Sequence, residues 1–132
     1  MTEPQAATAI IAASPTKVRA ALTDAPNLPD WNPAFRRVTG PTEPTVGAPY
    51  SLSVRGGLSG HFTYTRIEPR RVDATWEVPG FRETATWTLQ PHGSGTMVGH
   101  SFQHSGPLAA LLTRSYVGVA HVRLDRLAQH VG

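Results

Sequence analysis

The end of the chain, residues 107–131, carries apolar side chains at helical spacing and follows a run of short segments with strand character. Gly106 and Pro107 open this stretch, and Pro is favoured in the first turn of a helix. A single helix of roughly 25 residues is about 37 Å long, enough to cover one face of a sheet. A curved sheet wrapped around such a helix need not close tightly on it, and the remaining space predicts a cavity for a small molecule.

The length of 132 residues predicts a single domain, 1–132, with a hydrophobic core of its own. No apolar run approaches the roughly 18 residues that would cross a bilayer, so we expect no membrane insertion. The sequence holds no cysteine, which excludes disulfides and thiolate metal sites. Residues 1–9 lack the basic and then apolar pattern of a secretory signal. Together these features predict a cytoplasmic protein.

The net charge is +3, and all but one of the 12 basic residues are arginine. The arginines are dispersed along the chain and adjacent only at 36–37 and 70–71. Because a nucleic-acid surface needs a concentrated basic patch, we expect no nucleic-acid partner.

The first third of the chain predicts one strand and two short helices. Residues 5–13 are apolar and alternate moderately, as in a strand, and Ser14-Pro15 then predicts the N-cap and first turn of a helix that ends near Thr23. Residues 24–33 contain three prolines and Trp31, and predict a second short helix or an irregular turn.

The middle of the chain predicts six further strands separated by short Gly- and Pro-rich turns. Their expected ranges are 35–39, 49–55, 61–68, 72–78, 81–90 and 96–104. Short connections join antiparallel neighbours. The order of elements therefore predicts an α+β fold, a curved antiparallel sheet of about seven strands wrapped around the long C-terminal helix.

Several short motifs, taken in order, resemble one known family. They are Ala13-Ser14-Pro15-x-x-Val18, Trp31-Asn32-Pro33, Ile67-Glu68-Pro69, Trp87-Thr88-Leu89-x-Pro91 and Phe102-x-x-Ser105-Gly106-Pro107-Leu108. The chain resembles the SRPBCC or START-like superfamily, in its polyketide cyclase/dehydrase and lipid-transport branch. The resemblance implies the helix-grip fold with a deep pocket between the sheet and the C-terminal helix. It does not imply a reaction, since members bind lipids, sterols, plant hormones or polyketides and only some are enzymes.

Strand alternation predicts which side chains face this pocket. The side chains that we expect to contact a ligand are Tyr50, Tyr64, Trp76, Trp87, Phe102, His104 and Tyr116. In the strand 61–68, Phe62 and Tyr64 favour one face and Ile67 the other, which predicts a β-bulge. Trp31 is expected either to anchor a lid over the end of the pocket or to contact the ligand.

Three polar side chains lie on the otherwise apolar inward face: Glu83, His100 and His104. A buried carboxylate is costly, so we expect Glu83 to lie near the rim, to have a partner or to be protonated. If the protein is an enzyme, Glu83 and His100 are the expected catalytic acid and base. Otherwise these groups bond to one another or orient a ligand.

The sequence predicts no metal and no cofactor. His100 and His104 are four residues apart on a strand, or about 13 Å, which is too far for both to bind one zinc ion. On the last helix we expect Arg114, Arg123, Asp125 and Arg126 to face solvent.

Three hypotheses about function follow. The first is binding of a hydrophobic small molecule, lipid or polyketide-like, in the cavity between sheet and helix. The second is a polyketide cyclase or dehydratase that uses His and Glu acid–base chemistry in the same cavity. The third is a protein that pairs with a partner subunit, which a filled cavity would favour. The sequence leaves a homodimer and enzymatic activity open.

Overall fold

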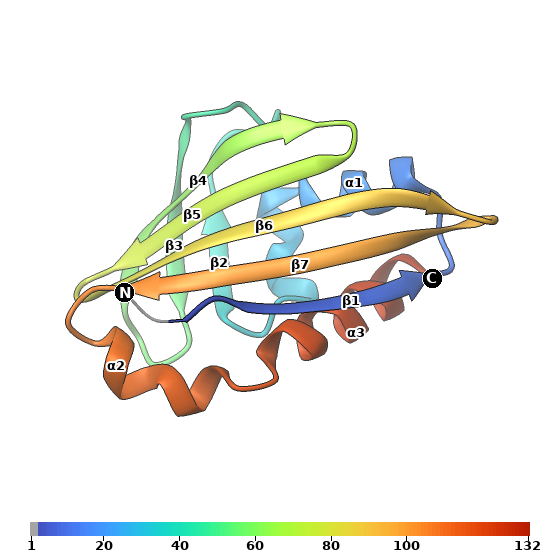
Figure 1. The fold of residues 1–132 in the computed structure, drawn as a ribbon. Coiled ribbons are helices and arrows are strands. Elements are labelled where there is room, and N and C mark those ends of the chain that lie inside the picture. Colours follow the sequence, from blue (N-terminus) through green and yellow to red (C-terminus); the bar gives the residue numbers. More distant parts are fainter. Residues whose placement is uncertain (1–2) are drawn as a thin grey trace.

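A computed structural model describes residues 3–132 as one antiparallel sheet with helices packed on one of its faces (Figure 1). The strands are β1 (Gln5–Ile11), β2 (Phe35–Thr39), β3 (Pro49–Val54), β4 (Ser59–Glu68), β5 (Arg71–Val78), β6 (Phe81–His92) and β7 (Gly95–Ser105). The helical segments are α1 (Pro15–Leu22), the 3-10 helix η1 (Ala25–Asp30), α2 (Ala109–Leu112), the 3-10 helix η2 (Thr113–Tyr116) and α3 (Val119–Val131).

The seven strands follow the order β1-β7-β6-β5-β4-β3-β2, and every neighbouring pair is antiparallel. This arrangement confirms the α+β fold and the strand number expected from the sequence. The register of β4 against β5 shifts between Tyr64 and Arg66. The bulge inferred from the conflicting faces of Tyr64 and Ile67 is therefore present.

Alternation along the central strands produces the core. In β6 the odd-numbered side chains from 81 to 89 are buried, whereas Thr84 and Thr88 are exposed on the opposite face. In β7 the buried set includes Val98 and Phe102 together with His100 and His104. Because alternate residues of a strand share a face, burial of the apolar members also buries the polar ones.

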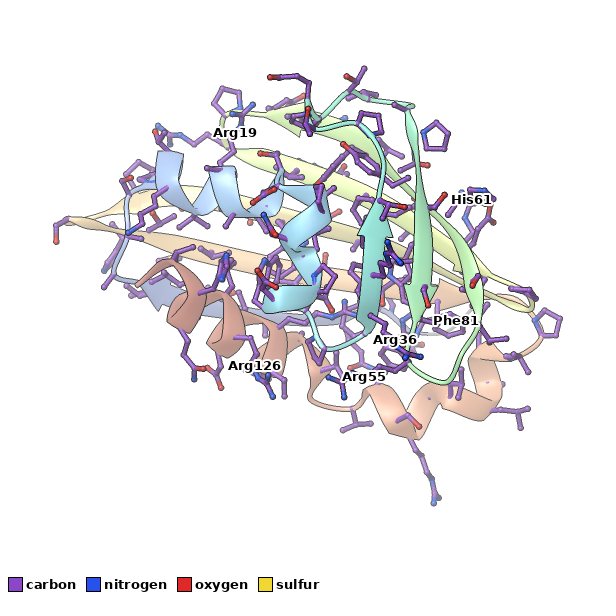
Figure 2. The ribbon with its side chains drawn as sticks, turned by 180° about the vertical axis from the view of Figure 1, so that it is seen from behind. Arg19, Arg36, Arg55, His61, Phe81 and Arg126 are labelled. Atoms are coloured by element: carbon purple, nitrogen blue, oxygen red, sulfur yellow. The ribbon has the colours of Figure 1, made fainter. Side chains whose placement is uncertain are left out.

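The helix α1 begins where Ser14 accepts a hydrogen bond from the backbone N–H of Lys17 at 3.2 Å, with Pro15 in its first turn. Val18 and Leu22 point from this helix into the core. Seen from behind, α1, η1 and α3 lie across the same face of the sheet (Figure 2). That face therefore bounds the space between sheet and helices.

The C-terminal segment differs from the single long helix expected for residues 107–131. It divides into α2, η2 and α3, and α3 has only 13 residues. The break lies at Val117, which is extended (φ −62°, ψ 125°), and at Gly118, whose φ is +80°. Glycine adopts this left-handed conformation without steric strain, and the β-branched neighbours Val117 and Val119 favour helix only weakly. Within residues 3–132 no helix is long and apolar enough to cross a membrane.

The break displaces the first part of this segment from the centre of the sheet. The backbone N–H of Leu108 donates to the carbonyl of Gly80 at 2.9 Å, which fixes the start of α2 at the β5–β6 turn. As a result α2 lies beyond the strand ends, while α3 runs along the sheet (Figure 1). This arrangement leaves an opening between α2, η2 and the strand ends.

We expect Gly118→Ala to lower the free energy of unfolding by about 1 kcal/mol, because Ala is strained at positive φ. No atom lies within 4 Å of a Cβ at this position, so the effect reports backbone conformation and not a clash. Urea unfolding measures it, and Gly118→Asn, which tolerates positive φ better, should lose less. A stabilised Gly118→Ala would mean that the segment prefers a continuous helix.

Candidate functional site

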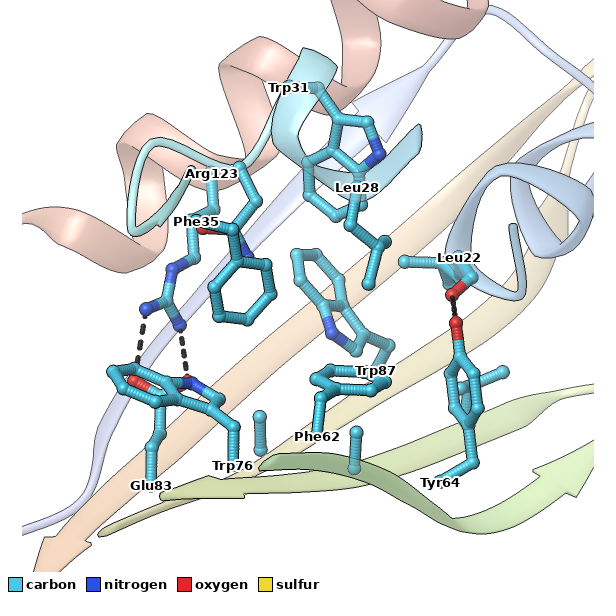
Figure 3. A pocket seen from close by; sticks show the side chains of 14 residues that line it. Leu22, Leu28, Trp31, Phe35, Phe62, Tyr64, Trp76, Glu83, Trp87 and Arg123 are labelled. Atoms are coloured by element: carbon cyan, nitrogen blue, oxygen red, sulfur yellow. Dashed lines mark hydrogen bonds and ion pairs between the residues drawn. The ribbon is translucent and has the colours of Figure 1, made fainter. Parts of the chain in front are cut away.

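A small cavity lies between the sheet and the helices, and we call it the inner cavity (Figure 3). Six aromatic side chains line it: Trp31, Phe35, Phe62, Tyr64, Trp76 and Trp87. Asn32, Glu83 and Arg123 are the polar or charged side chains in its wall. Its free volume is about 20 Å³, which is room for about one water molecule.

The charged part of the wall is a buried ion pair between β6 and α3. Arg123 donates from Nη2 to Oε1 of Glu83 at 2.9 Å and from Nη1 to Oε2 at 3.0 Å (Figure 3). Both side chains are about 1% exposed. Two parallel bonds between planar groups give this contact a fixed geometry as well as a charge balance.

Two neighbouring strands complete the coordination of the Glu83 carboxylate. Trp76 on β5 donates from Nε1 to Oε2 at 2.8 Å, and His104 on β7 donates from Nε2 to Oε1 at 2.8 Å. Burial by itself raises the pKa of Glu83, but the charge of Arg123 and the hydrogen bonds from His104 and Arg123 outweigh it and lower the pKa to about 2. Glu83 is therefore ionised and accepts four hydrogen bonds.

His100 extends the network on the other side of Arg123. Its Nδ1 lies 3.1 Å from the carbonyl oxygen of Thr86 and donates to it, so Nε2 is free to accept from Nη1 of Arg123 at 3.2 Å. The ring stacks on Trp87 with centroids 3.6 Å apart. Burial first, and then the charge of Arg123, lower the pKa of His100 to about 3. At neutral pH His100 is thus uncharged, with both ring nitrogens occupied.

The sequence did not predict the role of Arg123. It was expected to face solvent with Arg114, Asp125 and Arg126, yet it is 1% exposed, whereas those three are exposed. The expectation was wrong because it was based on the charge of the side chain and not on its position along the helix. Arg123 lies three residues after the buried Ala120 and four before the buried Leu127, so helical spacing places it on the inward stripe.

The structure brings only some of the expected ligand-contact residues to the inner cavity. Tyr64, Trp76 and Trp87 line it, and the Tyr64 hydroxyl is held by the Leu22 carbonyl at 2.6 Å. Tyr50 packs against Phe62 and Tyr64 and is not part of the wall. The expected set also omitted Leu28, Asn32, Phe35 and Phe62, which line the cavity.

Phe102 and His104 also lie outside the cavity wall. Phe102 lies under the Arg123 guanidinium, 4.7 Å from ring centroid to Cζ. His104 lies between Glu83 and the ring of Tyr116, whose centroid is 4.3 Å away. They support the network and do not face the cavity.

A second space, which we call the outer groove, opens between α2, η2 and the strand ends. Its free volume is about 150 Å³. Its lining is mainly apolar and includes one charged side chain, Arg55. The apolar side chains include Val54, Leu58, Val78, Phe81, Leu108 and Leu112. Trp76 lines both the outer groove and the inner cavity, so its indole ring lies between the two spaces.

Tyr116 is the hydroxyl-bearing side chain of the outer groove. Its ring stacks on Phe81 with centroids 5.6 Å apart. Burial, and then the negative charge of Glu83, raise its pKa to about 12. The hydroxyl therefore stays protonated and is able to donate a hydrogen bond at any physiological pH.

Within residues 3–132, no three His, Asp or Glu side chains gather closely enough to hold a metal ion. The polar groups of the site form the hydrogen-bonded network of Glu83, Arg123, His100, His104 and Trp76.

Comparisons with known proteins agree with this architecture. A family model described as polyketide cyclase / dehydrase and lipid transport matches residues 6–132. A comparison with curated proteins finds no match.

Solved structures share the fold at low sequence identity. Protein CV1439 from Chromobacterium violaceum has a TM-score of 0.77 at 21% identity, covering 99% of this chain and 98% of that one. A START superfamily protein from Mycobacterium smegmatis has a TM-score of 0.77 at 15% identity, covering 98% and 97%. CalU16 from Micromonospora echinospora has a TM-score of 0.66 at 22% identity, covering 98% and 76%. These likenesses show the fold.

We expect Glu83→Gln to lower the free energy of unfolding by about 3–5 kcal/mol, because it leaves the charge of Arg123 buried without a counter-charge. The control is Glu77→Gln, which removes an exposed carboxylate 3.7 Å from Arg82 and should cost less than about 1 kcal/mol. The double variant Glu83→Leu with Arg123→Met removes both charges, so its free energy of unfolding should fall by less than that of Glu83→Gln alone. Urea unfolding measures these free energies. Equal losses of stability in Glu83→Gln and Glu77→Gln would show that the buried pair is not stabilising.

The stability of the protein should fall as the pH falls below 6.5. The pKa of His100 drops from its ordinary 6.5 to about 3 on folding, so in that range the unfolded chain binds a proton that the folded chain does not. Glu83, whose pKa drops from 4.5 to about 2, adds to the loss below pH 4.5. Urea unfolding at a series of pH values measures this slope.

His100→Asn should flatten the slope between pH 6.5 and 4.5, because its amide retains the bond to Thr86 without binding a proton there. His92→Asn, at an exposed position, is the matched control for the substitution itself. A slope that persists in His100→Asn would assign it to another group.

Proposed function

The chain belongs to the polyketide cyclase/dehydrase and lipid transport family, and on that premise we propose that it binds a hydrophobic small molecule between the sheet and the C-terminal helical segments. The ligand lies in the outer groove and extends past Trp76 into the inner cavity. The apolar outer groove beside an aromatic-lined cavity is the feature that supports this function. Such sites bind mainly by removing apolar ligand surface from water.

The volumes of the two spaces set the size of the ligand. A cavity of about 150 Å³ is known to accept a molecule of benzene size. The inner cavity adds only about 20 Å³, so a larger ligand requires Trp76 to move. The hydrogen bond from its Nε1 to Glu83 holds the indole ring in the present position. We propose that a ligand replaces Trp76 between the two spaces.

The geometry favours binding over acid–base catalysis. A general base must reach a substrate proton with a free lone pair and a pKa near the working pH. Glu83 has a pKa of about 2 and accepts four hydrogen bonds, and both nitrogens of His100 are occupied. In the proposed function these side chains position Arg123 and Trp76.

The small free volume of the inner cavity is also what the third hypothesis, pairing with a partner subunit, would expect. The outer groove favours the binding hypothesis, because it is open and mainly apolar in the single chain. Native mass spectrometry with fatty acids, sterols and aromatic polyketides separates all three. An added mass supports binding, a product mass supports the enzyme, and a dimer without adducts supports the subunit.

We expect Leu112→Trp to weaken binding of the uncharged dye N-phenyl-1-naphthylamine by about 10-fold or more, since the larger side chain fills the outer groove. The control is Leu111→Trp, because Leu111 is 78% exposed and does not line the groove. Dye fluorescence in a titration measures both affinities. Equal binding by the two variants would place the dye elsewhere and contradict the proposed site.

A further inference from the structure

The surface around the mouth of the outer groove leaves large apolar side chains exposed. Leu58, Leu111 and Val117 are 42%, 78% and 73% exposed, and they are three of the six large apolar side chains that the described part of the chain leaves exposed. Leu58 lines the groove, and Leu111 and Val117 are chain neighbours of the lining residues Leu112 and Tyr116. Single exposed apolar residues are common, but a group of them around an apolar opening is typical of an interaction surface.

The helical segment that borders the groove is only partly covered by the rest of the molecule. In α2 the buried residue is Ala109, and η2 has no buried residue. The hydrogen bond from Leu108 to the β5–β6 turn attaches the segment to the sheet, and the segment lies beyond the strand ends (Figure 1). Leu108 and Leu112 line the groove, so the opposite side of the segment is free to contact a partner.

The charges around the opening are positive. Arg55 lines the groove from the β3–β4 turn, and Arg114 lies between the lining residues Leu112 and Tyr116 on the helical segment. Among the described residues, no carboxylate lies within 4 Å of either guanidinium group. The sequence has no aspartate or glutamate between residues 84 and 124. The groove mouth therefore combines exposed apolar side chains with arginines that have no counter-charge.

This combination matches the chemistry of an anionic lipid bilayer. Apolar side chains insert to a shallow depth among the lipids, and the negative headgroups attract the arginines. An acidic protein surface also attracts arginines, but it would cover the groove that lies between them. A bilayer instead leaves the groove facing the apolar layer, so an apolar ligand enters it without crossing water.

We propose that the α2–η2 segment and the β3–β4 turn dock the protein on an anionic lipid bilayer. Leu58, Leu111 and Val117 insert near the headgroups, and Arg55 and Arg114 bind the negative charges of the headgroups. The contact is peripheral, since no helix in the described chain is long and apolar enough to cross a membrane. The inference names a partner of the protein and does not depend on which small molecule occupies the groove.

Binding of the full chain to lipid vesicles tests the inference. Vesicles of phosphatidylcholine with about one-third phosphatidylserine should sediment the protein, and vesicles of phosphatidylcholine alone should bind it at least about 10-fold more weakly, because only negative headgroups attract the arginines. Raising the salt concentration to about 1 M should remove most of this difference, since charges are then screened beyond about 3 Å.

Matched variants test the individual residues in the same sedimentation experiment. Val117→Ser should weaken binding to the anionic vesicles by about 5-fold, because it removes apolar surface that inserts. Its control is Val46→Ser, which changes a 53% exposed valine in the loop before β3, away from the groove. Arg114→Gln should also weaken binding by about 5-fold. Its control is Arg70→Gln, because Arg70 precedes β5 at the end of that strand opposite the groove.

A fluorescent label reads insertion directly. The chain has no cysteine, so a single introduced cysteine carries the label at one position. An environment-sensitive fluorophore on Val117→Cys should shift its emission to shorter wavelength when anionic vesicles are added. The same fluorophore on Val46→Cys should not respond.

The outcomes separate this inference from the proposed function. If the dye binds the groove but anionic vesicles neither sediment the protein nor change the label at position 117, the docking inference is wrong and the small-molecule proposal stands. If the vesicles bind and the dye does not, the docking surface stands and the proposed function is wrong. A label at position 117 that is already shielded in a dimer without vesicles would show that this surface pairs with a second copy, and would contradict docking on a membrane.

Discussion

The buried ion pair between Glu83 and Arg123 holds the site together. It joins the central strand β6 to α3, and through Trp76 and His104 it also reaches β5 and β7. Each member is about 1% exposed, so neither charge is tolerable without the other. Three consecutive strands and the distant helix α3 thereby meet at one carboxylate, which fixes the position of α3 on the sheet.

The two spaces of the site arise on either side of Trp76. The break at Gly118 lets α3 lie over the sheet, while α2 and η2 remain at the strand ends and border the outer groove. A continuous helix over residues 107–131 could not both lie over the sheet and border the outer groove at the strand ends. The hydrogen bond from Trp76 to Glu83 holds the indole ring between the two spaces, so the network that joins α3 to the sheet also limits the size of the inner cavity.

The chemistry of the network separates two roles that the residue types alone left open. A glutamate and two histidines on an apolar face are compatible with acid–base catalysis and with ligand orientation. Here the hydrogen bonds of the network occupy the lone pairs of Glu83 and His100. Groups with occupied lone pairs are poorly placed to take a proton from a substrate, which is why the proposed function is binding.

The sequence by itself determined the features that depend on neighbouring residues. Strand alternation, turn residues and the Ser14 cap predicted the seven strands, the bulge after Tyr64 and the inward faces of Glu83 and His100, because these depend on local geometry. The pairing of Arg123 with Glu83, the attachment of α2 to the β5–β6 turn and the exclusion of Tyr50 from the cavity were decided only by the tertiary structure. Each depends on partners far along the chain: the carboxylate that makes a buried arginine tolerable lies 40 residues away, and no local pattern specifies that contact.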